Sequence, residues 1–380
     1  MYNNKRIELN YPEDQMLASR ERMKARAQFS YFDRVPVVCS VSLRYILLER
    51  GVGYDEYFSN PESEVYHQLM NRKWRLEHIY DDAVQGTGVG VSPDFSTVRG
   101  SMFDVDIHWS DTEIPKTIPI LHSVEDVRRL KVPPPTNGLC GRKIEWYHEM
   151  KEIVREFDVT FNGKPVSVSV GIGGEGGPLP IALSLAGENL YLWAAGAPDV
   201  LHELMRKSTQ AFIDYENYIR ELTGRPKHGC GMGCDGGEML SPEDFSEFVV
   251  PYYSRIYEEF PGSRGLHMCG KIDHLLDIIR DDMKINSLNG FGDPVDRKLL
   301  AAKFGGRVHI TGGVNIALLL DGTREQVRAD CMDALEIFAP AGGYILQDGN
   351  NVAPGTSLEN LNVMMECSKA FGLPSSVSRN

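Results

Sequence analysis

The chain has 380 residues, of which 42% are hydrophobic and 24% are charged, a composition ordinary for a globular protein. Its 40 lysines and arginines against 53 aspartates and glutamates give a net charge of −13, which argues against nucleic acid or an anionic membrane as the main partner. No uninterrupted apolar run reaches the ~18 residues that a transmembrane helix needs.

The cysteines and the N-terminus indicate the compartment. The chain has 7 cysteines, an odd number that fits reduced thiols better than a framework of disulfides. The N-terminal segment, about residues 1–18, begins MYNNKRIELNYPEDQ, has no apolar signal region and is expected to form a short polar arm. We therefore expect a cytoplasmic protein. Four thiols are expected to be inert, namely those of Cys39, Cys140, Cys331 and Cys367.

Short apolar, β-branched runs bounded by Gly, Pro and Asp recur along the chain and predict strands. In chain order they cover 36–41, 88–92, 165–171, 227–232, 265–270, 285–290, 308–313 and 343–349. A charged helix ending near 33–34 precedes the first run. Further helices are predicted over 185–222, 242–260, 271–282, 294–304, 323–339 and 358–371. Ser241 followed by Pro242, and Thr323 followed by Gln326, are typical helix starts.

The alternation of strands and helices predicts the fold class. Strands that alternate with helices imply a parallel sheet, and eight such units imply an α/β protein of the (β/α)₈ TIM barrel type. Residues 93–164 exceed one crossover and predict an insertion between the second and third strands, with strands in 103–109 and a helix over 143–157. We expect a single domain over 1–380.

A candidate metal site lies at the stretch GLHMCG. His267 and Cys269 are two apart, so on a strand both side chains face the same way. The preceding strand, in KHGCGMGCDGG, would bring Cys230, Cys234 and Asp235 to the same C-terminal rim of the barrel, where active sites form.

Thiolate, imidazole and carboxylate are ligands of Zn²⁺, and a catalytic zinc has three protein ligands and one open position. His267, Cys269 and Cys230 are the expected three, with Cys234 or Asp235 able to complete the sphere. The alternative is that the cysteines merely suit a tight Gly-rich turn and that His267 is a hydrogen-bonded core histidine.

Five stretches in order carry a family resemblance. They are RERMKARAQFSYFDRVPV (20–37), GGEGGPLPIALSLAG (173–187), GGEMLSPEDFSEFVVPYYSRI (236–256), HITGGVNIALLLDGT (309–323) and GGYILQDGNNVAPGTSLENL (342–361). Together they resemble the uroporphyrinogen decarboxylase superfamily. That superfamily contains decarboxylases and zinc-dependent, corrinoid-linked methyltransferases on one (β/α)₈ barrel.

The resemblance favours the methyltransferase branch. The decarboxylases carry an arginine-rich loop after the first strand, whereas VVCSVSLRY (37–45) retains only Arg44 and Tyr45 of it, and no acidic residue stands between 35 and 48. One arginine cannot neutralise a substrate with many carboxylates. The methyltransferases use the His-x-Cys pair as zinc ligands, which implies these roles for His267 and Cys269.

One position departs from the methyltransferase pattern. Relatives that methylate coenzyme M have a further zinc cysteine in the last-strand loop, where this chain has Asn350. Either Cys230 replaces that thiolate from a neighbouring strand, or the site binds metal poorly.

The resemblance implies a methyltransferase that moves methyl from a small methylated substrate to the Co(I) of a corrinoid protein, with Zn²⁺ as Lewis acid. Aryl methyl ethers are the preferred substrates, in an O-demethylation, because phenolate is a good leaving group. The chain contains no DxHxxG-type loop, so the corrinoid is expected on a separate partner protein. Family members are often dimers, which makes a homodimer an expectation as well.

Other rim residues receive roles from their positions. Met232, Met268 and Phe291 are predicted to line an aryl pocket, with core packing as their alternative role. Asn289, Asn315, Asn350 and Arg44 are predicted to bind the substrate, and Asn289 is also a candidate catalytic group. Asp235 is a candidate zinc ligand or proton acceptor. Glu175 and Gly177 lie in the loop GIGGEGGPLP, which is expected to approach the corrinoid or the substrate closely.

Three other functions remain open. The enzyme could move methyl from a methylcorrinoid to a thiol or a folate, or it could decarboxylate an acid as uroporphyrinogen decarboxylases do. The third alternative is a corrinoid- or substrate-binding protein without catalysis. The identity of the methyl donor, the direction of transfer and the residue that completes the metal site are likewise open.

Overall fold

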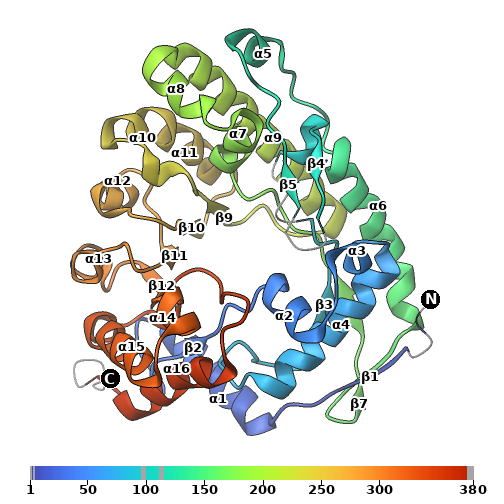
Figure 1. The fold of residues 1–380 in the computed structure, drawn as a ribbon, viewed down its shortest axis with the longest axis vertical. Coiled ribbons are helices and arrows are strands. Elements are labelled where there is room, and N and C mark those ends of the chain that lie inside the picture. Colours follow the sequence, from blue (N-terminus) through green and yellow to red (C-terminus); the bar gives the residue numbers. More distant parts are fainter. Residues whose placement is uncertain (1, 3–4, 96–99, 111–114, 375–380) are drawn as a thin grey trace.

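The computed structural model describes residues 2, 5–95, 100–110 and 115–374. Its centre is a ring of parallel strands with helices outside it (Figure 1). The strands of this ring, one for each predicted run, are β2 (Val37–Val38), β3 (Val89–Val91), β8 (Val168–Val170), β9 (Cys230–Gly233), β10 (Arg264–His267), β11 (Ser287–Phe291), β12 (His309–Val314) and β13 (Tyr344–Asp348).

The strand order is that of a (β/α)₈ barrel. One ladder joins six strands in the order β2-β13-β12-β11-β10-β9, and a second ladder joins β3 to β8. Every pairing in both ladders is parallel. Within each ladder the strands are in the order of a TIM barrel, so the predicted α/β class is confirmed, although the described residues show no pairing between the two ladders.

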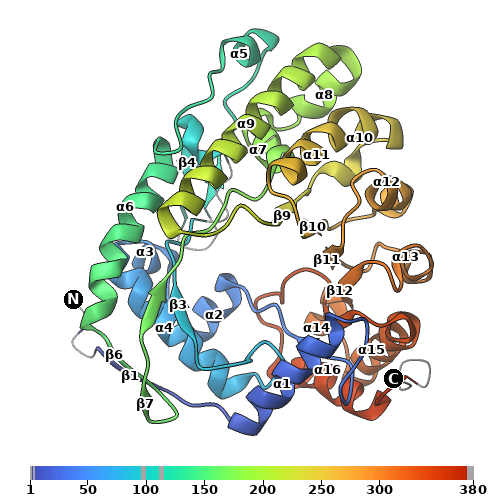
Figure 2. The same cartoon turned by 180° about the vertical axis from the view of Figure 1, so that it is seen from behind.

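Helices precede, connect and follow these strands. They are α1 (Glu13–Arg26), α2 (Leu43–Arg50), α3 (Tyr54–Tyr57), α4 (Pro61–His78), α5 (Val124–Arg129), α6 (Gly138–Ile153), α7 (Pro178–Ala186), α8 (Asn189–Gly196), α9 (Pro198–Thr223), α10 (Pro242–Phe248), α11 (Val250–Glu259), α12 (Leu276–Asp281), α13 (Arg297–Phe304), α14 (Ile316–Asp321), α15 (Arg324–Phe338) and α16 (Leu358–Phe371). Most of them lie outside the ring, whereas α2 lies within it in both views (Figure 1 and Figure 2). The hydroxyls of Ser241 and Thr323 cap α10 and α15 as predicted. None of the described helices is long and apolar enough to cross a lipid bilayer.

The structure divides two predicted helices, and the one over 242–260 becomes α10 and α11, which meet at Val249. Residues 185–222 were expected to be continuous, but α7 ends at Gly187 with φ +56°, and Pro198 begins α9 after a second break. Glycine at positive φ and proline at a first helical turn are typical of such boundaries. The helices α2, α3 and α4 between the first two barrel strands had not been predicted.

The N-terminal segment is more ordered than a polar arm. Strand β1 (Arg6–Leu9) buries Ile7 and Leu9 and pairs in parallel with β6 (Asp158–Phe161), which forms a hairpin with β7 (Lys164–Pro165). This small sheet lies at the outer edge of the molecule, near the N-terminus (Figure 2).

The insertion contains less strand than expected in 103–109, and two strands, β5 (Lys116–Thr117) and β6, outside that segment. Within 103–109, only β4 (Ile107–His108) is a strand, and it pairs with β5. The helix predicted over 143–157 is α6, which begins earlier, at Gly138.

Candidate active site

Three side chains gather at the C-terminal ends of β9 and β10. The carboxylate of Asp235, the imidazole of His267 and the thiol of Cys269 place one ligand atom each within 4.8 Å of one another. The Cys269 thiol donates to Oδ1 of Asp235 at 3.1 Å, and Nε2 of His267 lies 3.7 Å from the same oxygen. All three residues are partly exposed, so the group is accessible.

Strand register explains why these residues meet. His267, the last residue of β10, is paired with Gly233, the last residue of β9. The segments that leave the two strands therefore begin side by side, and each carries a ligand two residues further on, Cys269 and Asp235. The C-terminal rim is where barrel enzymes place their active sites.

A hydrogen bond to Asn289 orients the imidazole. His267 is paired in register with Asn289 on β11, and its Nδ1 lies 2.9 Å from the Asn289 Oδ1. An amide oxygen only accepts, so Nδ1 carries the proton and Nε2 is left as the ligand atom on the side of Asp235. Metal-binding histidines usually have such an acceptor behind them.

The local charge suits a cation. Burial, followed by the hydrogen bond and the negative charge of Asp235, raises the pKa of the Cys269 thiol to about 12, and the carboxylate of Glu238 acts in the same direction. A divalent cation reverses this effect, because it stabilises the thiolate. Carboxylate, imidazole and thiolate are all zinc ligands, and three of them leave one position open. The donor set therefore fits a catalytic zinc.

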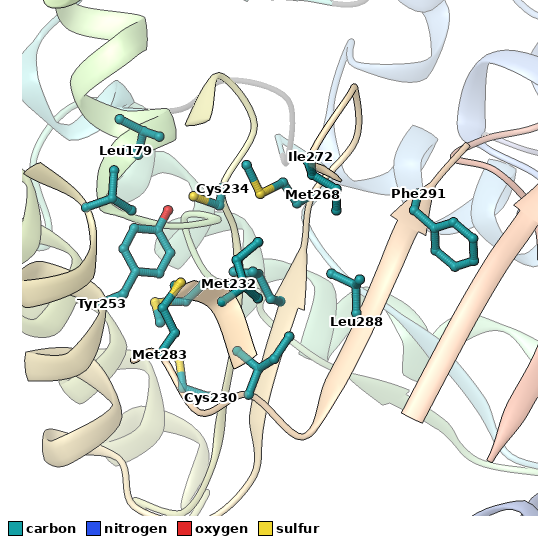
Figure 3. Packing of buried hydrophobic residues seen from close by; sticks show 14 of the residues in the cluster. Leu179, Cys230, Met232, Cys234, Tyr253, Met268, Ile272, Met283, Leu288 and Phe291 are labelled. Atoms are coloured by element: carbon teal, nitrogen blue, oxygen red, sulfur yellow. The ribbon is translucent and has the colours of Figure 1, made fainter. Parts of the chain in front are cut away.

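Cys230 and Cys234 lie outside this group, which differs from the expected ligand set. Cys230 begins β9 and is paired with Arg264, three residues before His267, which places it about 10 Å lower along the barrel wall. Cys234 follows Gly233 and therefore faces the opposite side, where it is fully buried. Figure 3 shows both sulfur atoms among apolar side chains. Burial raises the pKa of each thiol.

The predicted aryl pocket is part of the core. Met232, Met268 and Phe291 are at most 3% exposed, and the Phe291 ring packs edge-on against Phe338 at 5.4 Å. Met232 borders the barrel cavity, but its side chain lies on the outer face of β9, away from it (Figure 3).

The structure places three of the predicted polar residues as follows. The Asn315 side chain caps α14 by accepting from the backbone N–H groups of Ala317 and Leu318, so it is a structural cap. Asn350 follows β13 at the rim and accepts a hydrogen bond from Asn351 at 3.1 Å. Arg44 is exposed on α2, and no described residue forms a hydrogen bond or an ion pair with it.

The loop GIGGEGGPLP is a structural element of the barrel wall. Glu175 is 1% exposed and forms an ion pair with the equally buried Lys143 at 3.3 Å, so its carboxylate does not reach a ligand. Gly177 has φ +153°, and a Cβ there would lie 2.4 Å from the carbonyl oxygen of Gly233. Its missing side chain allows close approach to β9.

A cavity of about 480 Å³ opens beside the His267 imidazole and was not predicted. Barrel interiors are normally filled by branched side chains. Here the inner positions of β9, β10 and β11 are small residues, namely Gly231, Gly233, Gly265 and Ser287. Arg26 of α1 and Thr311 of β12 complete the lining. The sequence signal was the alternation Cys-Gly-Met-Gly, in which each glycine falls on the inner face.

Comparisons with known proteins agree with this architecture. The family model described as Uroporphyrinogen decarboxylase (URO-D) matches residues 18–371. A methylcobamide:CoM methyltransferase MtaA of Methanosarcina barkeri is 24% identical over 355 residues, 90% of this chain and 95% of that protein. A uroporphyrinogen decarboxylase of Xanthomonas oryzae is 25% identical over 293 residues, 72% and 77% of the two chains. The solved structure of a methyltransferase from Methanosarcina mazei has a TM-score of 0.66 at 21% identity, covering 93% of this chain and 99% of the other.

Proposed function

The chain belongs to the uroporphyrinogen decarboxylase family, and from that premise we propose that it is a corrinoid-dependent methyltransferase. It moves methyl from a small methylated substrate, with aryl methyl ethers preferred, to the Co(I) of a separate corrinoid protein. The observation that carries the proposal is the group of Asp235, His267 and Cys269, of which His267 also lines the barrel cavity. The methyltransferase relatives, which span nearly the whole chain, support it.

Each residue of the group has a proposed role. Asp235, His267 and Cys269 would hold a zinc ion, and the hydrogen bond from His267 to Asn289 would keep the imidazole in place for it. Zinc, when bound, supplies a Lewis acid for the oxygen atom that loses its methyl group. The Co(I) of the corrinoid partner would supply the electron pair that takes the methyl carbon, and the electron pair of the carbon–oxygen bond would stay on the oxygen. The product phenolate then takes a proton from water.

The donor set favours demethylation over thiol methylation. A carboxylate donates less charge to a metal than a thiolate, so Asp235 in place of a second thiolate leaves the ion more electron-poor. An electron-poor ion activates a leaving oxygen well, whereas a bound thiol nucleophile benefits from thiolate-rich ligation. The relatives that methylate coenzyme M make transfer to a thiol the second candidate.

The cavity is unsuited to a substrate with many carboxylates. Arg26 is the one arginine or lysine among the described lining residues. A porphyrinogen requires several cations to neutralise it. Decarboxylation of such a substrate is therefore disfavoured.

The test mixes the zinc-loaded protein with a Co(I) corrinoid protein and a panel of methoxybenzenes. We expect the absorbance change of Co(I) to methyl-Co(III), with one phenol formed per methyl transferred, and no change after zinc is removed by a chelator. Methyl transfer from methylcorrinoid to a thiol, without reaction of any ether, would reverse the assigned direction. Carbon dioxide release from a porphyrinogen would replace it with decarboxylation.

A further inference from the structure

A single arginine lies inside the barrel below the rim. Arg26 is the last residue of α1, and its side chain lines the same cavity as His267 and Asn289. Its Nε donates to the carbonyl oxygen of Gly343 at 3.0 Å, and Nη2 donates to the Thr311 hydroxyl at 3.2 Å. These two bonds hold the guanidinium at the inner wall of the barrel.

The guanidinium lacks a counter-ion. No described carboxylate forms an ion pair with Arg26, and two of its five N–H donors are used by the bonds to Gly343 and Thr311. Burial lowers the pKa of Arg26 to about 10, so the group is still protonated at neutral pH. A largely buried cation without an acidic partner is costly unless a ligand neutralises it.

We propose that Arg26 binds an anionic group on the methyl-bearing substrate, which makes the substrate a small methoxylated aromatic carboxylate. This inference rests on the proposed function. The ether oxygen faces Asp235, His267 and Cys269, while the carboxylate lies across the cavity against the guanidinium. Arginine suits this role because its planar N–H fork matches a carboxylate with two parallel hydrogen bonds.

Strand register sets the distance between the two ends. His267, Asn289 and Thr311 are paired with one another on three successive strands. Two strand spacings separate the imidazole from the hydroxyl that Arg26 contacts, about 10 Å. A benzene ring with a methoxy and a carboxylate group fits this span, with a metal contact at one end and a hydrogen bond at the other.

The glycines make room for such a ring. Gly231 has no atom within 4 Å of the position that a Cβ would occupy, so its inner face is open space. The cavity volume of about 480 Å³ is within the usual range for small-ligand sites. Its small lining residues, Gly231, Gly265 and Ser287, leave an aromatic ring free to lie between the imidazole and the guanidinium.

The test is calorimetric binding to the zinc-loaded protein, without any corrinoid. The probes are 3-methoxybenzoate and its neutral analogue 3-methoxybenzyl alcohol. We expect Arg26→Gln to weaken benzoate binding about tenfold or more and to change alcohol binding by less than about twofold. Lys24→Gln, an exposed position on the same helix, removes the same charge and is expected to change neither. Equal effects of Arg26→Gln on both probes, or no binding of the benzoate by the unmodified protein, would overturn the proposal.

A second variant tests the proposal independently of Arg26→Gln, and a second anionic ligand tests which anion is bound. Gly231→Val fills the open space without touching Arg26, and it is expected to abolish binding of both probes even if Arg26→Gln fails to fold. Retained benzoate binding in Gly231→Val would place the ligand elsewhere and overturn the proposal.

A second anion, 2-mercaptoethanesulfonate, tests whether Arg26 binds a carboxylate or a sulfonate. Arg26-dependent binding of this sulfonate alone would overturn the carboxylate assignment. Arg26-dependent benzoate binding without methyl transfer to Co(I) would leave the anion site standing and refute the proposed function instead.

Discussion

The thiol of Cys269 and the Oδ1 of Asp235 are joined by a hydrogen bond of 3.1 Å, although the residues are 34 positions apart in the chain. The bond connects the segments that follow two neighbouring barrel strands. A carboxylate thus occupies the place beside the His-x-Cys pair for which a thiolate from Cys230 had been predicted. Because metal binding displaces the thiol proton, the same two atoms can become ligands of one ion.

Zinc content distinguishes the group of Asp235, His267 and Cys269 from the predicted ligand set with Cys230. Asp235→Ala and Cys269→Ala each remove one of three donors, so both variants are expected to lose most of the zinc that the unmodified protein binds, about one ion per chain. Cys230→Ala removes a thiol at the opposite end of β9 and is expected to retain it. Plasma mass spectrometry after dialysis measures the content. Loss of zinc in Cys230→Ala with retention in Asp235→Ala would instead support the ligand set predicted from the sequence, in which Cys230 binds the ion.

Substitution of Asn289 tests whether its hydrogen bond positions the imidazole of His267 for zinc. Asn289→Ala removes the acceptor of the His267 Nδ1 proton and is expected to weaken zinc affinity by about 10–100-fold, measured by competition with a chelator. Asn289→Asp keeps an acceptor oxygen and should restore the affinity.

A matched control for Asn289 exists at Asn315. That side chain caps α14, so Asn315→Ala should cost about 1 kcal/mol of folding free energy and leave zinc affinity unchanged. An Asn289→Ala protein that binds zinc as tightly as the unmodified chain would show that His267 does not need this partner.

Local periodicity was enough to predict the barrel and part of the site. Each predicted strand run overlaps one observed barrel strand, because β-branched runs between glycines are a local signal. His267 and Cys269 followed from the two-residue period of a strand. Cys230 was misplaced because β9 begins at this residue instead of at residue 227. Cys230 therefore lies at the N-terminal end of the strand and not at the rim.

The parts that escaped prediction depend on contacts between distant segments. The pairing of Lys143 with Glu175 joins the insertion to the barrel wall across 32 positions. Arg26 reaches the barrel interior through contacts with Gly343 and Thr311, which are 317 and 285 positions away. No local pattern in a charged helix distinguishes this arginine from its exposed neighbours.

Substitutions in the ion pair of Glu175 and Lys143 test whether Glu175 has a structural or a cofactor-binding role. Both side chains are at most 2% exposed, so Glu175→Ala leaves a buried ammonium unpaired and should cost about 3–5 kcal/mol of unfolding free energy. The double variant Glu175→Leu with Lys143→Met should recover most of that loss. Urea denaturation measures both. A stable Glu175→Ala protein with weakened affinity for the corrinoid partner would instead support the role first predicted for this residue.

The buried carboxyl of Asp348 predicts a pH dependence of stability. Its Oδ2 accepts from the backbone N–H of Ser40 at 2.6 Å, while its Oδ1 is buried without a partner among the described residues. Burial raises the pKa of Asp348 to about 7, which the nearby Arg75 opposes and Asp81 reinforces. The unfolded chain has the ordinary value near 3.8, so between the two values the folded state binds more protons than the unfolded state.

The sign of the effect follows from this proton balance. Stability contributed by Asp348 is greatest below about pH 4 and falls as the pH rises through about 7, because the folded state must then hold a buried charge. Asp348→Asn keeps the acceptor for Ser40 and cannot ionise. Urea denaturation of both proteins at pH 5 and pH 8 should therefore show the variant gaining by a few kcal/mol relative to the unmodified chain at the higher pH. An equal difference at both pH values would mean that Asp348 is already ionised at pH 5 in the folded protein.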